Sequence, residues 1–372
     1  MADLYLKNGL DVQSQPIEIL MTNGKIEQVG QKLAGTTADR TIDLAGQSIV
    51  SAGWIDDHTH CYEKLTLYYD DPDQVGYMTG VTTVIDAGSC GADNISDFYA
   101  RTRAKRTNVY ALLNISRTGI LAQDELGDLS RVNFETFQNA VNEYPDFIVG
   151  MKARMSRSVV VGNGLQPLIL AKQFQAQLMH HLPLMVHVGT NPPELQAIMA
   201  QLKPGDIMTH CFNGKANGIL TTDDRIKPFV QSGYEQGIIF DVGHGTDSFN
   251  FHTAAVATAQ GLYPQTLSTD SYHRNRENGP VYNLATCIEK MLLLGYPLSE
   301  IIPMVTSRPA QNFKLTTKGQ LAPGYDADIT IFEIKHGSKK LTDSDGNTRI
   351  TDRLVKPEYS IVGGKVYMIG EL

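Results

Sequence analysis

The chain has 372 residues, of which 42% are hydrophobic and 19% are charged, and its formal net charge at pH 7 is -8. This composition is typical of a globular protein that is long enough for one large α/β domain and a smaller companion. The acidic balance argues against nucleic acid and anionic membranes as partners, and it leaves a small-molecule ligand as the expectation.

The chain begins MADLYLKNGLDV, with an acidic residue at position 3 and no long apolar stretch, so these residues do not resemble a signal peptide. No apolar run approaches the length of a membrane span. The cysteines at positions 61, 90, 211 and 287 form no CxxC pair, which favours reduced, buried thiols. We expect a cytoplasmic protein, and the sequence leaves open whether it forms a homo-oligomer.

Both ends of the chain have the pattern of β-hairpins. Near the start, PIEILM and IEQVG flank Asn23-Gly24, a pair that favours a tight type I′ turn. Near the end, ADITIFEI is followed by YSIVGGKVYMIG, with a second turn at Gly363-Gly364. Because neither end is large enough for a core of its own, residues 1–52 and 316–372 are predicted to share one small β-sandwich domain.

Between the two ends, apolar β-like runs alternate with helix-like segments such as 168–181 and 284–295. Eight such runs occur, at residues 48–60, 81–89, 109–116, 147–155, 182–190, 206–214, 237–245 and 266–272. Strands separated by helices form parallel sheets, and eight βα units close a barrel. We therefore predict an α/β fold in which residues 53–315 form a (β/α)8 TIM barrel.

The first run ends in GWIDDHTH, in which His58 and His60 stand two residues apart. Side chains at i and i+2 of a strand point to the same face, so the two imidazoles can converge. An isolated HxH pair is more often a polar strand end than a metal site. Other runs, however, also contain residues that could bind a metal, and the carboxyl ends of barrel strands meet at the same end of the barrel. The residues predicted to gather there are His58, His60, Lys152, His187, His210 and Asp270.

Four imidazoles and a carboxylate suit a borderline metal such as zinc. Lys152 does not fit this set as an ammonium, because divalent metals would repel it and its ordinary pKa is about 10.4. The residue makes sense if CO2 has converted its amine into a carbamate, an anionic ligand able to bridge two metals.

This ordered set of residues resembles the amidohydrolase superfamily of metal-dependent hydrolases, and the resemblance covers nearly the whole chain. TSRPAQNFKL at 306–315 and LAPGYDADITIFEI at 321–334 are also similar to segments of that superfamily. The runs DHTHCY and HCFNG look like the amidohydrolase/deacetylase branch. This branch implies removal of an acyl group, by amide or ester hydrolysis, from a small carboxylate-bearing compound.

The resemblance also implies roles for the six residues. His58, His60 and Asp270 would bind one divalent metal, His187 and His210 the other, and carboxylated Lys152 both, with zinc as the metal most consistent with the set. A bridging hydroxide would attack the carbonyl carbon. Asp270 would be the catalytic residue, accepting the proton as general base and returning it to the leaving group as general acid.

Further polar residues near the strand ends are candidates for holding the substrate. An arginine at a barrel rim is at least as often a structural ion-pair partner, and a loop histidine is often only hydrogen-bonded. The candidates are Tyr62, Arg117, Arg154, His244, His273 and Arg274.

Three other functions remain open. A dihydroorotase- or hydantoinase-like cyclic amidase is disfavoured, because Cys61 and Tyr62 follow His60 where dihydroorotase-like members have a residue and then arginine. An adenine-deaminase-like enzyme would typically carry glutamate in place of Lys152. A non-catalytic assembly protein on the same fold would usually have lost ligands, whereas all six positions are filled here.

Overall fold

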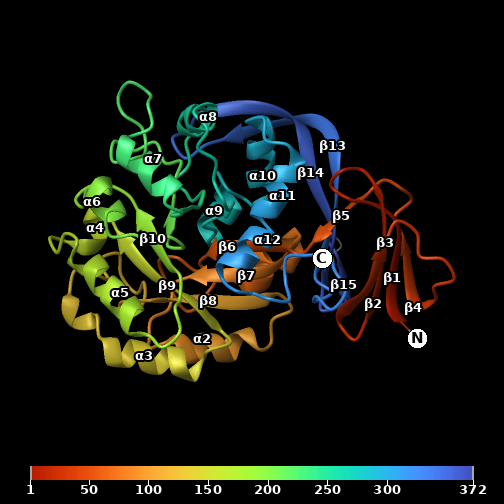
Figure 1. The fold of residues 1–372 in the computed structure, drawn as a ribbon, viewed down its shortest axis with the longest axis horizontal. Coiled ribbons are helices and arrows are strands. Elements are labelled where there is room, and N and C mark those ends of the chain that lie inside the picture. The colour runs from red at the N-terminus through yellow and green to blue at the C-terminus, as the bar shows by residue number, and fades with distance from the viewer. Residues whose placement is uncertain (1, 371–372) are drawn as a thin grey trace.

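The computed structural model describes residues 2–370. Met1, Glu371 and Leu372, which belong to the predicted terminal segments, lie outside the described residues. A large sheet surrounded by helices lies beside a smaller sheet that contains strands from both ends of the chain (Figure 1). None of the helices within residues 2–370 is long and apolar enough to cross a membrane.

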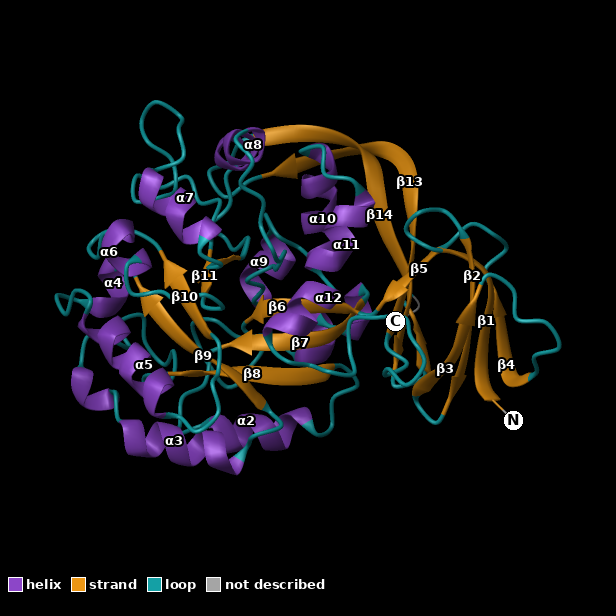
Figure 2. Ribbon diagram, viewed as in Figure 1, coloured by secondary structure: helices purple, strands orange, loops and turns teal. Residues whose placement is uncertain are grey.

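The smaller sheet is mixed and has eight strands (Figure 2), in the order β15-β14-β13-β5-β1-β2-β3, with β4 paired to β1. The prediction that both chain ends build one sheet is therefore confirmed, and its description as a sandwich stays a prediction. The strands are β1 (Ala2–Leu10), β2 (Pro16–Thr22), β3 (Lys25–Gly30), β4 (Ala38–Asp43), β5 (Ile49–Ala52), β13 (Ile329–Thr342), β14 (Thr348–Val362) and β15 (Lys365–Met368).

Both predicted hairpins are present. Asn23 and Gly24 join β2 to β3 with φ values of 51° and 72°, and Gly363 and Gly364 join β14 to β15 with φ values of 53° and 78°. Positive φ at both central positions is what a type I′ turn requires, which explains the Asn-Gly and Gly-Gly pairs.

Side chains from the two ends of the chain share one hydrophobic core. Leu4, Ile19 and Val50 from the N-terminal strands pack in the same buried cluster as Ile329 and Ile361 from the C-terminal strands. Strand β5 also pairs with β13. The N-terminal strands therefore depend on residues more than 270 positions away in the chain for their burial.

Deleting all residues after Leu321 is expected to make the protein insoluble. The deletion removes β13 to β15, so the apolar side chains of β1, β2 and β5 lose their cover and β5 becomes an exposed edge strand. The soluble fraction after expression, compared with that of a chain ending at Gly370, measures the effect. A soluble truncated chain that still binds metal would show that the two ends do not depend on each other.

The larger sheet has seven parallel strands, which neighbour one another in chain order. They are β6 (Trp54–Thr59), β7 (Val81–Ala87), β8 (Asn108–Asn114), β9 (Ile148–Met155), β10 (Leu184–Val188), β11 (Ile207–Thr209) and β12 (Ile239–Phe240). The helices are α1 (Pro72–Val75), α2 (Ile95–Thr102), α3 (Phe134–Glu143), α4 (Arg157–Val160), α5 (Gln166–Gln177), α6 (Leu195–Met199), α7 (Pro228–Glu235), α8 (Phe251–Ala259), α9 (His273–Asn278), α10 (Leu284–Leu293), α11 (Leu298–Met304) and α12 (Ser307–Asn312).

Two of the eight predicted runs differ from the structure. The run 48–60 is divided at Gly53, so that β5 belongs to the small sheet and β6 to the large one. A Cβ on Gly53 would lie 2.1 Å from Oγ1 of Thr82, so the division needs glycine there. The run 266–272 is not a regular strand. It makes single parallel bridges, from Thr266 to Asp241 beyond β12 and from Ser271 to Thr59 of β6.

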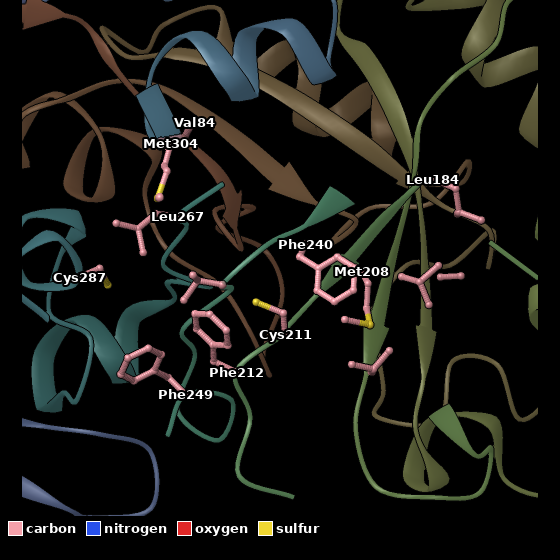
Figure 3. Close-up of a cluster of buried hydrophobic side chains, with 14 of the residues drawn as sticks. Val84, Leu184, Met208, Cys211, Phe212, Phe240, Phe249, Leu267, Cys287 and Met304 are labelled. Carbon is pink, nitrogen blue, oxygen red and sulfur yellow. The ribbon is translucent and has the colours of Figure 1, made fainter. Parts of the chain in front are cut away.

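The core of the larger body lies between the sheet and the helices. All four cysteines are buried and unpaired, as predicted. Figure 3 shows Cys211 near Phe212, Phe240 and Met208. The cysteines therefore serve as apolar packing residues, which is the usual role of a buried thiol.

The hairpin of β13 and β14 extends from the small sheet across α10 to the larger body (Figure 1). At its turn, the backbone N of Ser344 donates to the Phe249 carbonyl at 2.8 Å, and the Asp343 carboxylate accepts from the backbone N of Phe251 at 3.0 Å. The small sheet thereby holds the segment between β12 and α8, which contributes to the cavity described next.

Candidate active site

The carboxyl ends of the parallel strands surround a cavity of about 530 Å³. Five of the six predicted metal ligands line it, and His210 lies directly behind, with its ring centre 4.6 Å from that of His187. The lining residues are His58, His60, Leu67, Tyr68, Gln123, Lys152, Arg154, Ser156, Ser158, His187, Gly189, Thr190, Lys215, Thr246, Asp247, Ser248, Asp270, Tyr272 and Arg274.

The donor atoms of the predicted ligands converge. Oδ1 of Asp270 lies 3.4 Å from Nε2 of His58 and 3.3 Å from Nε2 of His60. Nζ of Lys152 lies 3.0 Å from the same Nε2 of His58. One donor atom each from His58, His210 and Asp270 fall within 4.8 Å of one another. Four elements far apart in the sequence thus deliver nitrogen and oxygen donors to one point.

Hydrogen bonds to Nδ1 orient the imidazole rings. Oγ1 of Thr209 lies 2.9 Å from Nδ1 of His58, and it donates its own proton to Oδ2 of Asp241 at 2.7 Å. The threonine oxygen must therefore accept from Nδ1–H of His58. This arrangement leaves Nε2 of His58 with a free lone pair directed to the cavity.

The same orientation holds for two other histidines. Nδ1 of His210 donates to the Gly243 carbonyl at 2.7 Å, and Nδ1 of His60 lies 2.9 Å from Oγ of Ser89. His210 therefore has Nδ1 bound to the protein and Nε2 available as a ligand, which is the arrangement found around metal-binding histidines. Nδ1 of His60 is likewise bound to the protein, at the Ser89 hydroxyl.

Burial keeps the imidazoles of His58, His187 and His210 neutral. It lowers the pKa of His58 and of His187 well below the ordinary value, and it lowers the pKa of His210 to about 3. Only a neutral imidazole has a lone pair for a metal, so the three rings are ready to coordinate at neutral pH.

Unusual backbone conformations orient two of the predicted ligands. His210 and Asp270 have φ values of 67° and 50°, in the left-handed region that non-glycine residues seldom adopt. The Asp270 carbonyl accepts from Nδ2 of Asn275 at 2.8 Å, which helps hold the conformation. A Cβ on Gly245 would lie 2.4 Å from Oδ2 of Asp270, so only glycine leaves room for this carboxylate. Backbone strain of this kind is concentrated at functional sites.

Lys152 is buried without a counter-ion. Its side chain contacts Nε2 of His58 and Sδ of Met185, at 3.0 and 3.3 Å, and no ion pair among residues 2–370 includes it. Burial lowers the pKa of Lys152 to about 7. Gly88, which has a φ of 81°, lies against the side chain of Lys152. A Cβ at this position would lie 2.5 Å from Cβ of Lys152, so a larger residue would displace the lysine.

Two of the six predicted substrate contacts, Arg154 and Arg274, line the cavity. Arg154 is buried, and its Nη1 lies 3.1 Å from each carboxylate oxygen of the buried Glu125. Its guanidinium also lies over the ring of Tyr68, 5.5 Å from the ring centre. Arg274 is exposed at the rim.

The other four candidates lie away from the cavity and have local partners. Tyr62 donates to Asp97 at 2.8 Å, because the chain leaves the strand after Thr59 and the two-residue alternation no longer applies. The remaining contacts are Arg117 with Asp93 at 2.8 Å, His244 with Nζ of Lys290 at 2.6 Å, and His273 stacked on Tyr69 with ring centres 4.0 Å apart.

The sequence did not identify several residues that line the cavity, among them Tyr68, Lys215, Asp247 and Tyr272. All four lie in loops after strand ends, where spacing carries no information about direction. Lys215, five residues after His210 in HCFNGKANG, is the one that a search for cations near the predicted ligands could have found.

Comparison with known proteins gives full-length matches. A family model for a deacetylase-like composite domain matches residues 321–368. A deacetylase from Enterococcus faecalis is 53% identical over 366 residues, covering 98% of this chain and 99% of the relative. The chain belongs to the amidohydrolase superfamily.

Further similar proteins include one more deacetylase and two solved structures named for other reactions. A deacetylase from Agrobacterium fabrum is 33% identical, covering 95% of this chain and 87% of the relative. A crystal structure of an adenine deaminase is 52% identical, with a TM-score of 0.97, over 99% of this chain and 100% of that chain. A crystal structure of a dihydroorotase is 33% identical, with a TM-score of 0.90, over 99% of both chains.

These relatives establish the class of the protein, which is a metal-dependent hydrolytic enzyme. They do not select a substrate, because two relatives of nearly equal identity are named for different reactions. The donor set fits the metal chemistry of this amidohydrolase: it supplies neutral imidazole nitrogens, a carboxylate and a buried lysine whose pKa is low.

Proposed function

We propose that this amidohydrolase is a deacylase, which hydrolyses an amide or ester bond between an acyl group and a small carboxylate-bearing compound. The observation that carries the proposal is the convergence of His58, His210, Lys152 and Asp270 at a cavity that also has cationic walls. A cavity of about 530 Å³ suits a small molecule.

In this proposal His58, His60 and Asp270 hold one zinc ion, His187 and His210 hold the second, and carboxylated Lys152 contributes to both. The bound metals would acidify water and polarise the substrate carbonyl. The run 266–272, which carries Asp270 and bridges both to β6 and to the residue after β12, would close the seven strands into a barrel. Residues 53–315 then form the catalytic domain, with residues 1–52 and 316–372 as the second domain.

Asp270 moves the proton in the proposed reaction. Burial by itself raises the pKa of Asp270, but opposing effects, of which the hydrogen bond from His60 is the largest, more than offset it, and the pKa lies below its ordinary value. The carboxylate is therefore ionised at neutral pH and can accept the proton from the attacking water. It then returns that proton to the leaving nitrogen or oxygen.

Adenine deamination is the second candidate, because the adenine deaminase relative is 52% identical over the full chain. Two features of this chain favour deacylation instead. Lys152 stands where a glutamate is typical of adenine deaminases, and Lys215 gives the cavity wall a cation without an ion-pair partner among the described residues, which a neutral purine does not need.

A hydrolysis screen of the zinc-loaded enzyme distinguishes these functions. The substrates are N-acyl amino acids, O-acyl hydroxy acids, cyclic imides and adenine, and released acid or ammonia is measured. Turnover of an acylated acid is expected. Release of ammonia from adenine, with no hydrolysis of any acyl compound, would replace the deacylase proposal by the deaminase.

Carboxylation of Lys152 should depend on pH. CO2 reacts only with the neutral amine, forming a carbamate and releasing a proton. With a pKa of about 7, the amine is mostly protonated at about pH 6 and mostly neutral at about pH 8. Metal-free protein under a fixed pressure of 13C-labelled CO2 should therefore show a carbamate NMR signal that rises between these two pH values.

The matched control for this experiment is Lys152→Met, which has a side chain of similar length without the amine. It should give no carbamate signal at either pH. A signal of equal size in this variant, or a wild-type signal that falls as the pH rises, would contradict carboxylation at Lys152.

A further inference from the structure

The cavity wall carries three cationic side chains besides Lys152, namely Arg154, Lys215 and Arg274. A substrate carboxylate would be drawn to such a wall. The three differ in how much of their charge is available, and this difference decides which one can anchor the substrate.

The positive charge of Arg154 is already balanced by an ion pair with Glu125. Its Nη1 contacts both oxygens of Glu125, whose side chain is fully buried. Moving this guanidinium to a substrate would leave Glu125 as an uncompensated buried charge, which is strongly destabilising. Arg154 therefore shapes the cavity and positions Tyr68, which lies against it, rather than binding an anion.

Lys215 and Arg274 have no ion-pair or hydrogen-bond partner for their side chains among the described residues. Arg274 is exposed at the rim, where water and salt screen its charge. Lys215 is half-buried, and burial lowers its pKa. Its ammonium has thus lost part of its hydration without gaining an acceptor, which is a cost that a bound anion would remove.

The loop that carries Lys215 is tied to a metal ligand. The backbone N of Lys215 donates to Oδ1 of Asn213 at 3.1 Å, while Nδ2 of Asn213 donates to the His210 carbonyl at 2.8 Å. The backbone N of Gly218 donates to the Lys215 carbonyl at 2.8 Å and closes the turn. The distance between the backbone of Lys215 and the proposed ligand His210 is therefore set by a short, hydrogen-bonded segment.

We propose that Lys215 binds the carboxylate of the substrate and so selects acids that carry the scissile acyl group at one fixed separation from that carboxylate. This inference rests on the deacylase proposal and deepens it. Holding the acid on a turn fixed to His210 would align the acyl carbonyl with the ligand cluster, and such alignment is a large part of catalytic rate enhancement.

The test compares N-acetylalanine with N-acetylalaninamide, which lacks the carboxylate charge, as substrates of the zinc-loaded enzyme. The wild type should prefer the acid by about 10–100-fold in kcat/KM, the range of one charged hydrogen bond. Lys215→Met should lose most of this preference through a higher KM for the acid. Arg274→Met, the matched control, should keep it.

A second measurement separates carboxylate binding by Lys215 from the hydrolytic reaction. It uses calorimetry to compare the affinities of the two compounds for holoenzyme that carries Asp270→Asn. If Asp270→Asn binds the acid more tightly than the amide, and the added change Lys215→Met removes that difference, the role of Lys215 in carboxylate binding is supported. This holds even if the wild type hydrolyses neither compound, in which case only the deacylase proposal fails. The role of Lys215 would be overturned if the enzyme hydrolyses the acid preferentially and Lys215→Met keeps that preference. It would also be overturned if Arg274→Met abolishes the preference.

Discussion

Replacing Asp270 by asparagine is expected to lower kcat by a factor of about 10²–10⁴, the range of general acid–base catalysis, while most of the bound metal remains. The amide has nearly the same shape as the carboxylate, but it cannot accept and return a proton. Four imidazoles and Lys152 still surround the site, so metal content should change little. The loss should be greatest for poor leaving groups, which need protonation most.

Asp247→Asn is the matched control, because it removes the same charge from the same cavity at a residue outside the ligand cluster. Its effect on kcat is expected to be below about tenfold. Metal analysis and steady-state kinetics on both variants test whether Asp270 transfers the proton. An Asp270→Asn enzyme that hydrolyses an amide at nearly the wild-type rate with its metals bound would disprove the proton-transfer role.

Lys152→Ala is expected to lose metal and activity together, because the variant lacks the only group in the cluster that could become a bridging carbamate. Activity should fall by more than the factor of about 10–100 that is typical for loss of a residue that only hydrogen-bonds a metal ligand. Short carboxylic acids should restore part of both, since they can enter the space left by the side chain and supply the missing oxygens.

Lys290→Met provides the comparison for Lys152→Ala. Lys290 is also fully buried, but it is bonded to His244, to the Pro280 carbonyl and to the Thr342 carbonyl, away from the cavity. This variant should lower the melting temperature yet retain metal. Full metal loading in Lys152→Ala would show that the lysine is not part of the metal site.

The local pattern of the sequence was sufficient to predict most of the parallel strands and which candidate ligands gather at the cavity. Alternation with a period of two predicted that His58, in β6, and His60, just after it, face the same way. The order of the strands predicted that Lys152 and His187 lie at the same cavity. Turn chemistry identified both hairpins, at Asn23-Gly24 and Gly363-Gly364. These features depend on residues close together in the chain, so their spacing alone carries the information.

The tertiary structure alone decided how the site is oriented and which side chains face it. Thr209, Ser89 and Gly243 fix the histidine rings from other segments of the chain, and no local pattern in the sequence indicates such pairs. The directions of Tyr62 and Lys215 are set by loops that follow the strand ends, where the period of two no longer applies. Contacts between distant segments form only when the whole chain packs, so local spacing cannot encode them.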